Sequence, residues 1–213
     1  MATPATPGGT VPTVGVTTDP DLGSNAQRER RRRILDSTLA LASKGGYDAV
    51  QMRAVADKAD VAVGTLYRYF PSKVHLLVTA LARELERVES RADRSRLQGD
   101  TALERLRSVL DLITLAMQRD PLLTEAMTRA FMFADASAAT EVDAVAAVID
   151  RLLAGAMVTG EPSDEDLKIA RVISDVWMSN LVQWLTRRAS ATDVTNRLEL
   201  TIELLLAGRE SRS

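Results

Sequence analysis

Side chains able to contact a nucleic acid gather between residues 30 and 73 of this chain. Four consecutive arginines, Arg30 to Arg33, are followed by Arg53 and by the segment 63–73, which reads VGTLYRYFPSK. Guanidinium and ammonium groups bind phosphate, arginine also reads the edge of guanine, and threonine and tyrosine hydroxyls donate to phosphate oxygens. These residue types within one stretch favour recognition of double-stranded DNA.

The elements expected to carry these residues are two short helices, over 52–59 and 63–69, joined by a tight turn. In such a helix-turn-helix the second helix buries one face and offers the other to the major groove. Leu66 and Phe70 are four residues apart and are expected to point inward, whereas Gly64 allows the backbone to approach DNA closely. The expected DNA-binding residues are Arg31, Arg32, Arg53, Val63, Gly64, Thr65, Tyr67, Tyr69 and Lys73.

Each of these features also has a plainer structural interpretation. A run of charges is usually a solvated helix face, aromatic residues are usually core residues, and Arg53 alone reads as a surface residue. Their combination at this spacing is what favours DNA binding. His75, the single histidine, is expected to be an exposed helix residue rather than a ligand or a catalytic group.

The composition argues against several other classes of protein. The chain of 213 residues has no cysteine and one histidine, which excludes a disulfide framework, a thiolate nucleophile and a multi-histidine metal site. We therefore expect no metal and no cofactor, and the lack of a glycine-rich phosphate loop argues against an enzyme. No apolar run reaches the ~20 residues that cross a bilayer, so we expect a cytoplasmic protein with no membrane partner.

The charge is distributed unevenly along the chain. The formal net charge is −2, yet residues 25–91 hold 13 Lys and Arg against 8 Asp and Glu, whereas residues 92–213 hold 14 against 19. A basic first third followed by an acidic remainder fits a DNA-binding head on a body that does not touch DNA.

The pattern behind the head predicts helices throughout, nine in all, and thus an all-α fold with two domains. Residues 1–24 are rich in Pro, Gly and Thr and are expected to form a disordered tail. The head is expected over 25–71 and the body over 72–213. The expected helix signals are a capping box at Ser24 and Gln27, a stop at Gly45 and Gly46, further caps at Ser72, Thr101, Ser163 and Asp193, and an end at Gly208.

The segment from Gly64 to Lys73, GTLYRYFPSK, resembles the end of the DNA-binding head in the TetR family of bacterial repressors. The resemblance is dense over residues 28–85 and continues behind them as the order and length of helices. Three positions depart from the family pattern: Gln51 and Ala62 replace better helix caps, and Asp60 stands where glycine is frequent in the turn. Asp tolerates a left-handed backbone, so we expect the turn to survive.

Three segments, 45–75, 122–130 and 173–177, resemble one subgroup of the family, the actinobacterial repressors of cholesterol catabolism. That resemblance implies a sterol-derived effector, such as a coenzyme A thioester, and control of steroid catabolism. An alternative is a regulator of a drug-efflux or fatty-acid operon with another apolar effector. An enzyme, a helical scaffold or an RNA-binding module are the competing classes, and the sequence leaves open whether the protein activates or represses.

The family resemblance further implies a homodimer on a palindromic operator, formed by the last two helices, and an effector cavity inside the body. Methionine and aromatic residues suit an adaptable apolar cavity, although each of them alone is as readily explained by core packing. The expected cavity residues are Met117, Leu122, Met127, Phe131, Trp177, Met178, Leu181 and Trp184, with Met132 and Phe133 as further candidates. Arg119, Arg129, Arg171, Arg187 and Arg188 are available to bind the phosphates of a thioester.

Overall fold

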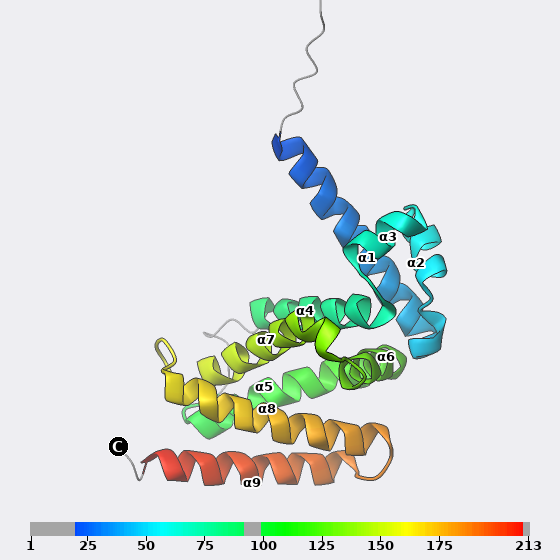
Figure 1. The fold of residues 1–213 in the computed structure, drawn as a ribbon. Helices are drawn as coiled ribbons and strands as arrows, with labels where there is room; N and C mark the ends of the chain where they lie inside the picture. The colour runs from blue at the N-terminus through cyan, green and yellow to red at the C-terminus, as the bar shows by residue number, and fades with distance from the viewer. Residues whose placement is uncertain (1–19, 92–98, 211–213) are drawn as a thin grey trace, which may run out of the picture.

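The computed structural model describes residues 20–91 and 99–210, which form nine α-helices and one 3-10 turn and contain no strand (Figure 1). This confirms the predicted all-α class and the predicted number of helices. The elements are α1 Pro20–Ala49, α2 Met52–Ala59, α3 Val63–Tyr69, α4 Lys73–Arg91, α5 Ala102–Arg119, α6 Pro121–Met132, η2 Ala136–Ala138, α7 Ala139–Met157, α8 Asp164–Leu185 and α9 Ala191–Glu210.

The first three helices form a head that stands away from the rest of the molecule (Figure 1). The α1 helix is interrupted at Gly45 and Gly46, and Gly46 has a φ of 65° that disfavours any other residue. The turn between α2 and α3 places Asp60 at a φ of 52°, so aspartate occupies the left-handed position as expected. Leu66 and Phe70 are almost completely buried and anchor α3 in the head.

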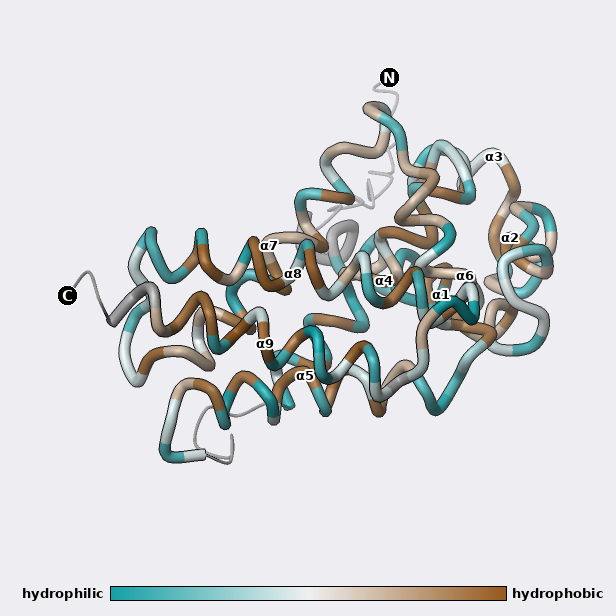
Figure 2. The backbone as a smooth tube through the Cα atoms, turned by 90° about the horizontal axis from the view of Figure 1, so that it is seen from below, coloured by the Kyte–Doolittle hydropathy of each residue, from teal (hydrophilic) through white to brown (hydrophobic). Residues whose placement is uncertain are grey.

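The remaining helices form a body below the head. The α4 helix joins the two parts, because its first turn follows α3 directly and its length packs against α6 and α7. The α8 and α9 helices run side by side on the face of the body farthest from the head (Figure 1). Apolar and polar residues alternate along the helices (Figure 2). The buried apolar residues of head and body belong to one continuous core.

The helix starts follow from local capping. The Thr101 hydroxyl accepts a hydrogen bond from the Glu104 amide, and the Glu104 carboxylate accepts one from the Thr101 amide, so the predicted cap at Thr101 is part of a capping box. Ser163 and Asp166 form a second box at α8. Ser72 accepts from the amides of residues 74 and 75 at the start of α4, as predicted.

Two predicted helix starts and one predicted end were wrong. The α1 helix begins at Pro20, so Ser24 lies inside it rather than capping it; proline is well suited to a first helical turn, where its missing N–H is not needed. The part of the predicted tail over 1–19 lies outside the described residues. The cap of α9 is Ser190, with Asp193 returning bonds to it from the third helical position, and α9 runs to Glu210.

Among the residues that the structure describes, no helix is long and apolar enough to cross a membrane.

Candidate DNA-recognition face and effector cavity

The α3 helix divides its residues between the core and an exposed face. Leu66 is fully buried, whereas the next residue, Tyr67, is 48% exposed. A Cβ atom added at Gly64 would meet nothing within 4 Å, so the backbone there is open to a large partner. Val63 and Thr65 are half-buried beside it. This exposed face can bring a hydroxyl, an aromatic ring and a bare backbone segment to a DNA groove.

One predicted contact residue of this part of the head, Tyr69, is not simply exposed, and one exposed residue, Arg68, was missed. Tyr69 is half-buried, with its ring centroid 6.3 Å from that of Phe70, because the short helix turns it toward the core. Arg68, which the pattern did not select, is exposed on the same helix. Its position two residues after the buried Leu66 was the available signal. Arg53 is exposed near the start of α2.

The arginine run of α1 is used in two ways. The guanidinium of Arg31 lies 5.7 Å from the centroid of the Phe70 ring and its side chain is exposed, which keeps a cation next to α3. Arg32 instead donates to Glu29 and lies 3.5 Å from the carboxylate of Asp36. The ion pair with Arg32 lowers the pKa of the Glu29 carboxyl. Arg32 is therefore tied to α1 itself more than Arg31 is.

Lys73, predicted to meet phosphate, has partners inside the protein. Its ammonium lies 3.8 Å from the centroid of the Tyr47 ring and donates to the Tyr47 carbonyl at 3.2 Å. Burial lowers the pKa of this lysine. The guanidinium of Arg129 lies 4.5 Å from the same ring, and Glu125 accepts from the Tyr47 amide. We call these four residues the Tyr47 joint; it fastens the end of α1 to α4 and α6.

His75 is only 7% exposed, so the expectation of an exposed residue was wrong. Its Nε2 atom lies 3.0 Å from the Ser137 carbonyl and its Nδ1 atom 2.9 Å from the Ser72 hydroxyl. Because a carbonyl oxygen can only accept, Nε2 carries a proton and donates. The ring thereby links the first turn of α4 to η2, a contact between residues 62 positions apart.

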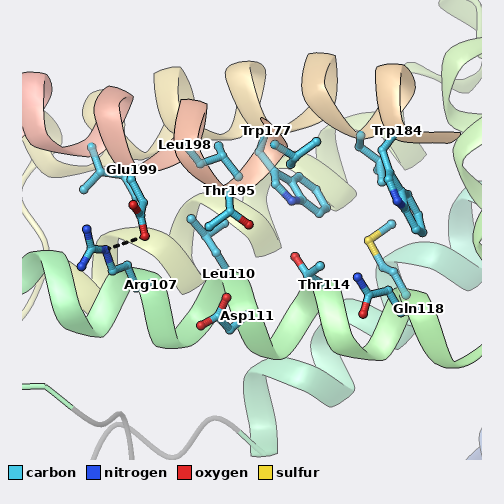
Figure 3. Close-up of a pocket in the computed structure, with 14 residues that line it drawn as sticks. Arg107, Leu110, Asp111, Thr114, Gln118, Trp177, Trp184, Thr195, Leu198 and Glu199 are labelled. Atoms are coloured by element: carbon cyan, nitrogen blue, oxygen red, sulfur yellow. Dashed lines mark ion pairs between the residues drawn. The ribbon is translucent and has the colours of Figure 1, made fainter. Parts of the chain in front are cut away.

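A cavity of about 100 Å³ lies between α5, α8 and α9 (Figure 3). Four of the predicted cavity residues line it, namely Met117, Trp177, Leu181 and Trp184. Both tryptophans face this space (Figure 3). The cavity also has residues that the sequence did not select: Arg107, Leu110, Asp111, Thr114, Gln118, Val194, Thr195, Leu198, Glu199 and Ile202.

The other predicted cavity residues lie elsewhere. Met127 is buried in the main core, and Phe131 and Met178 pack against that core. Leu122 is 47% exposed and lies near Gly46 rather than in the body interior. Met132 and Phe133 are exposed at the end of α6. A methionine-rich composition did not distinguish core from cavity, because both environments accept the same side chains.

The polar end of the cavity is closed by an ion pair between α5 and α9. The Nε atom of Arg107 lies 3.2 Å from the Glu199 carboxylate (Figure 3). A second nitrogen of Arg107 lies 3.5 Å from the Glu203 carboxylate. At the opposite end, the α8–α9 connection brings Arg187 and Arg188 beside Trp184 in a shallow depression.

The remaining candidate arginines have other surroundings. Arg129 belongs to the Tyr47 joint, and Arg171 forms an ion pair of 2.7 Å with Asp150, a carboxyl whose pKa is raised by burial. Arg119 ends α5 as an exposed residue. Arg187 and Arg188 line the shallow depression that also includes the cavity residue Trp184.

Two family models match the chain. The model described as bacterial regulatory proteins, tetR family, covers residues 34–80, and the one described as a tetracyclin repressor-like C-terminal domain covers residues 99–205. The HTH-type transcriptional repressor KstR of Rhodococcus jostii is 71% identical over 192 residues, 90% of either chain. KstR of Mycobacterium tuberculosis is 62% identical over 208 residues, 98% of this chain and 94% of the relative.

Solved structures agree with this match. A TetR transcriptional regulator from Rhodococcus sp. RHA1 superposes with a TM-score of 0.77 at 29% identity, over 85% of this chain and 97% of that one. FadR of Thermus thermophilus, a TetR-family repressor in complex with lauroyl-CoA, gives a TM-score of 0.61 at 22% identity, over 83% of this chain and 93% of that one. The second likeness concerns the fold alone.

Proposed function

Since the chain belongs to the TetR family of bacterial regulatory proteins, we propose that it is a transcriptional repressor whose dimer binds palindromic operators and leaves them when an apolar effector binds. The identity of 62–71% to two KstR repressors, over at least 90% of the chain, carries this proposal. We further propose that it controls genes of steroid catabolism, as the sequence resemblance to that subgroup of repressors implies.

Operator recognition is assigned to the exposed side of α3 with its neighbours on α1 and α2. Thr65 and Tyr67 supply hydroxyls for phosphate or base edges, and Gly64 admits the DNA backbone. Arg31, Arg53 and Arg68 supply the positive charge that attracts the duplex. We leave Lys73 out of this set, because its ammonium is already held by the Tyr47 joint.

Dimerisation is assigned to α8 and α9. Val172 on α8 and Leu200 and Leu204 on α9 are large apolar residues that are 45%, 57% and 66% exposed in the single chain. Burying such residues against a second copy removes apolar area from water. Two heads related by a twofold axis suit two half-sites about 34–36 Å apart on one palindrome.

Effector binding is assigned to the cavity between α5, α8 and α9. Its volume of about 100 Å³ is well below the roughly 300–1,000 Å³ of small-molecule sites. An effector of sterol size therefore has to separate α5 from α8 and α9. A ligand that fits one arrangement of the helices and not the other shifts the population between them, which is what release from DNA requires.

The proposed effector is a sterol-derived acyl-coenzyme A thioester. The apolar part suits the tryptophan-lined cavity, and Arg187 and Arg188 beside Trp184 offer cations to the phosphates. The lauroyl-CoA complex of the Thermus relative indicates that this fold can hold an acyl-coenzyme A, without indicating which one.

The test is an anisotropy titration of labelled promoter DNA that contains a palindrome, at fixed salt, with and without a steroid acyl-coenzyme A thioester. We expect tight binding that the thioester reverses. Tyr67→Phe should weaken binding by about 1 kcal/mol, as for a lost hydrogen bond, without affecting the response to thioester. Free coenzyme A and lauroyl-CoA are the matched controls. Tight binding that no thioester reverses would remove the effector from the proposal, and no preference for any palindrome would remove the repressor.

A further inference from the structure

Besides the packing of α1 against α6 and α4, two separate groups of polar contacts join this helix to the body. One is the Tyr47 joint, which lies just past the interruption at Gly45 and Gly46. The other is Asp36, eight residues before the end of the regular part of the helix at Lys44, or about 12 Å along its axis. A helix attached at one point can rotate about that point, whereas a second attachment further along restricts its direction. The second group of contacts therefore restrains the direction of α1, and with it the head, in addition to the packing against α6.

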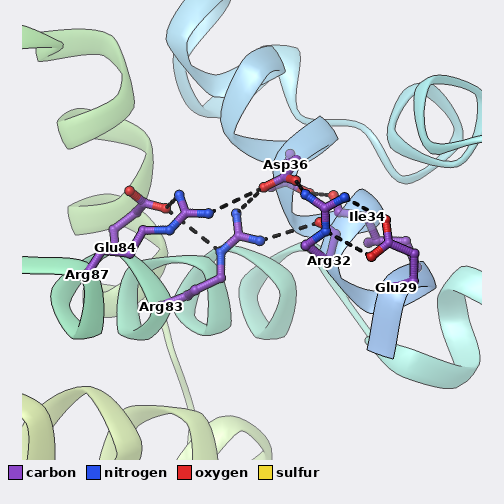
Figure 4. A network of polar contacts seen from close by, with 8 residues as sticks. Glu29, Arg32, Ile34, Asp36, Arg83, Glu84 and Arg87 are labelled. Atoms are coloured by element: carbon purple, nitrogen blue, oxygen red, sulfur yellow. Dashed lines mark hydrogen bonds and ion pairs between the residues drawn. The ribbon is translucent and has the colours of Figure 1, made fainter. Parts of the chain in front are cut away.

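The second attachment is made by Arg83 of α4 (Figure 4). One nitrogen of its guanidinium donates to the Asp36 carboxylate at 2.8 Å, and the other donates to the Arg32 carbonyl at 3.4 Å. A single planar group thus joins two acceptors one turn apart on α1. The Arg83 side chain is 16% exposed and that of Asp36 is 41% exposed, so the contact is shielded from water on the Arg83 side only.

Asp36 is the centre of a wider network. Arg87, one turn further along α4, lies 3.7 Å from the same carboxylate, and Arg32 lies 3.5 Å from it. Arg87 is 44% exposed and donates to Glu84 at 2.6 Å, so its main partner is on its own helix. Of the two α4 arginines, Arg83 is the less exposed one, and it donates hydrogen bonds across to α1. Arg87 is therefore a matched control for substitutions of Arg83.

We propose that Arg83 and Asp36 are positioning residues that fix the angle between the head and α4, and thereby set the half-site spacing that the dimer accepts. This rests on the proposed operator binding. When the guanidinium is lost, α1 keeps the Tyr47 joint as a pivot, and the head takes a wider range of angles. An arginine is needed at this position because its fork reaches both acceptors, whereas a lysine ammonium reaches one at a time.

The first experiment measures the head angle without DNA. The chain has no cysteine, so Lys58→Cys on α2 and Asp143→Cys on α7 give two unique labelling sites, both exposed. Spin-labelled chains diluted into unlabelled protein report one distance distribution between head and body by pulsed electron paramagnetic resonance. We expect Arg83→Met and Asp36→Asn to broaden or shift that distribution, Arg83→Lys to do so partly, and Arg87→Met to leave it close to that of the parent.

The second experiment measures spacing preference on operators. One inserted or deleted base pair moves the half-sites by about 3.4 Å and rotates them by about 35°. We expect the ratio of affinities for the natural and altered spacing to fall at least about threefold in Arg83→Met, with no further fall when Asp36→Asn is added. General loss of stability does not change this ratio, because the same folded protein binds both duplexes. Thermal unfolding of each variant is measured alongside.

The proposal is overturned if Arg83→Met keeps the parental distance distribution and spacing ratio, even when its stability falls. The same conclusion follows if Arg87→Met changes both as strongly as Arg83→Met does. A parent protein that prefers no palindrome would remove the proposed operator binding instead, and the distance distribution would still decide whether Arg83 fixes the head.

Discussion

At Gly64, folding and DNA recognition make opposite demands on one residue. Glycine is a poor helix former, and the space around it would accept a methyl group. We therefore expect Gly64→Ala to stabilise the protein by about 0.4–1 kcal/mol in denaturant unfolding. The same methyl group would stand where the DNA backbone is proposed to approach, so operator affinity should fall.

Gly160 provides the control for that substitution. It also has nothing within 4 Å of an added Cβ atom, but it lies in the connection after α7, away from the head. Gly160→Ala should leave operator affinity unchanged. Equal affinity of Gly64→Ala and the parent for the operator would contradict a close approach of DNA at this residue.

Single residues were predictable where their surroundings are local. Leu66 and Phe70 point inward because the spacing of four on a short helix leaves them no other common face. The exposure of His75 was misjudged, because its partner, the Ser137 carbonyl, comes from a distant part of the chain. Lys73 likewise contacts the distant Tyr47 ring, which the sequence did not indicate. A polar side chain is predicted to be exposed unless the sequence also indicates the group to which it binds.

At the scale of the element, the capping box of α5 carries a prediction about pH. Hydrogen bonds from residues 100 and 101 hold the pKa of Glu104 below its ordinary value of about 4.3. A carboxyl with a lowered folded pKa contributes stability above the unfolded pKa and loses it as the pH falls through the folded pKa. Glu104→Gln should therefore be less stable than the parent near pH 7.

The gap between Glu104→Gln and the parent should close as the pH falls from about 5 to 3, because the parental carboxylate is then protonated as well. Urea unfolding at several pH values measures it. Glu165→Gln, an exposed residue in the first turn of α8, is the comparison variant. A gap that stays constant with pH would mean that the charge of Glu104 contributes nothing.

The ends of helices were predictable where the residues that form the cap lie close together in the sequence. The caps at Thr101 and Ser163 were found because each cap and its partner lie within four residues of each other. The start of α9 was misplaced by three residues, because Ser190 and Asp193 form one reciprocal motif and the pattern alone does not say which of the two is the cap. Pro20 fits either a loop or a first helical turn, which moved the expected start of α1 to Ser24.

At the scale of the whole molecule, the proposed dimer can be tested on one side chain. Leu204 on α9 is 66% exposed in the single chain, and a carboxylate in its place would be buried without a partner in the dimer. We expect Leu204→Glu to shift the protein toward monomers in sedimentation velocity and to lose tight operator binding. Leu115→Glu on α5, at a position 55% exposed, should remain dimeric and bind the operator. A dimeric Leu204→Glu would place the interface elsewhere.

The cavity is the part of the molecule that the sequence described least well. It is lined by α5, α8 and α9, whose residues lie up to 95 positions apart, between Arg107 and Ile202. Four of eight expected residues are there, and the Thr114 and Gln118 side chains that add polarity to its α5 wall were not expected. Which face of each amphipathic helix meets which neighbour depends on crossing angles that no local pattern encodes.

The cavity also supplies its own reporter, since the chain has two tryptophans and both line it. An effector that enters between α5 and α8 must change the surroundings of Trp177, which is only 4% exposed without ligand. We therefore expect a steroid acyl-coenzyme A thioester to change tryptophan emission over the same concentration range in which it releases the operator. Thioester binding and operator release are thermodynamically linked. The curves of tryptophan emission and of operator release against thioester concentration must therefore coincide, once competition from DNA is included.

A variant that fills the cavity separates effector binding from operator binding. Thr114→Phe puts a ring into the cavity between α5 and the tryptophans, so it should weaken thioester binding at least about tenfold while operator affinity stays near that of the parent. Gln118→Ala, on the same α5 wall, enlarges the cavity instead of filling it and is the comparison variant. If Thr114→Phe still responds at the parental concentration, the effector binds elsewhere. If it loses the operator without any thioester, then filling this cavity is itself the signal that α4 carries to the head.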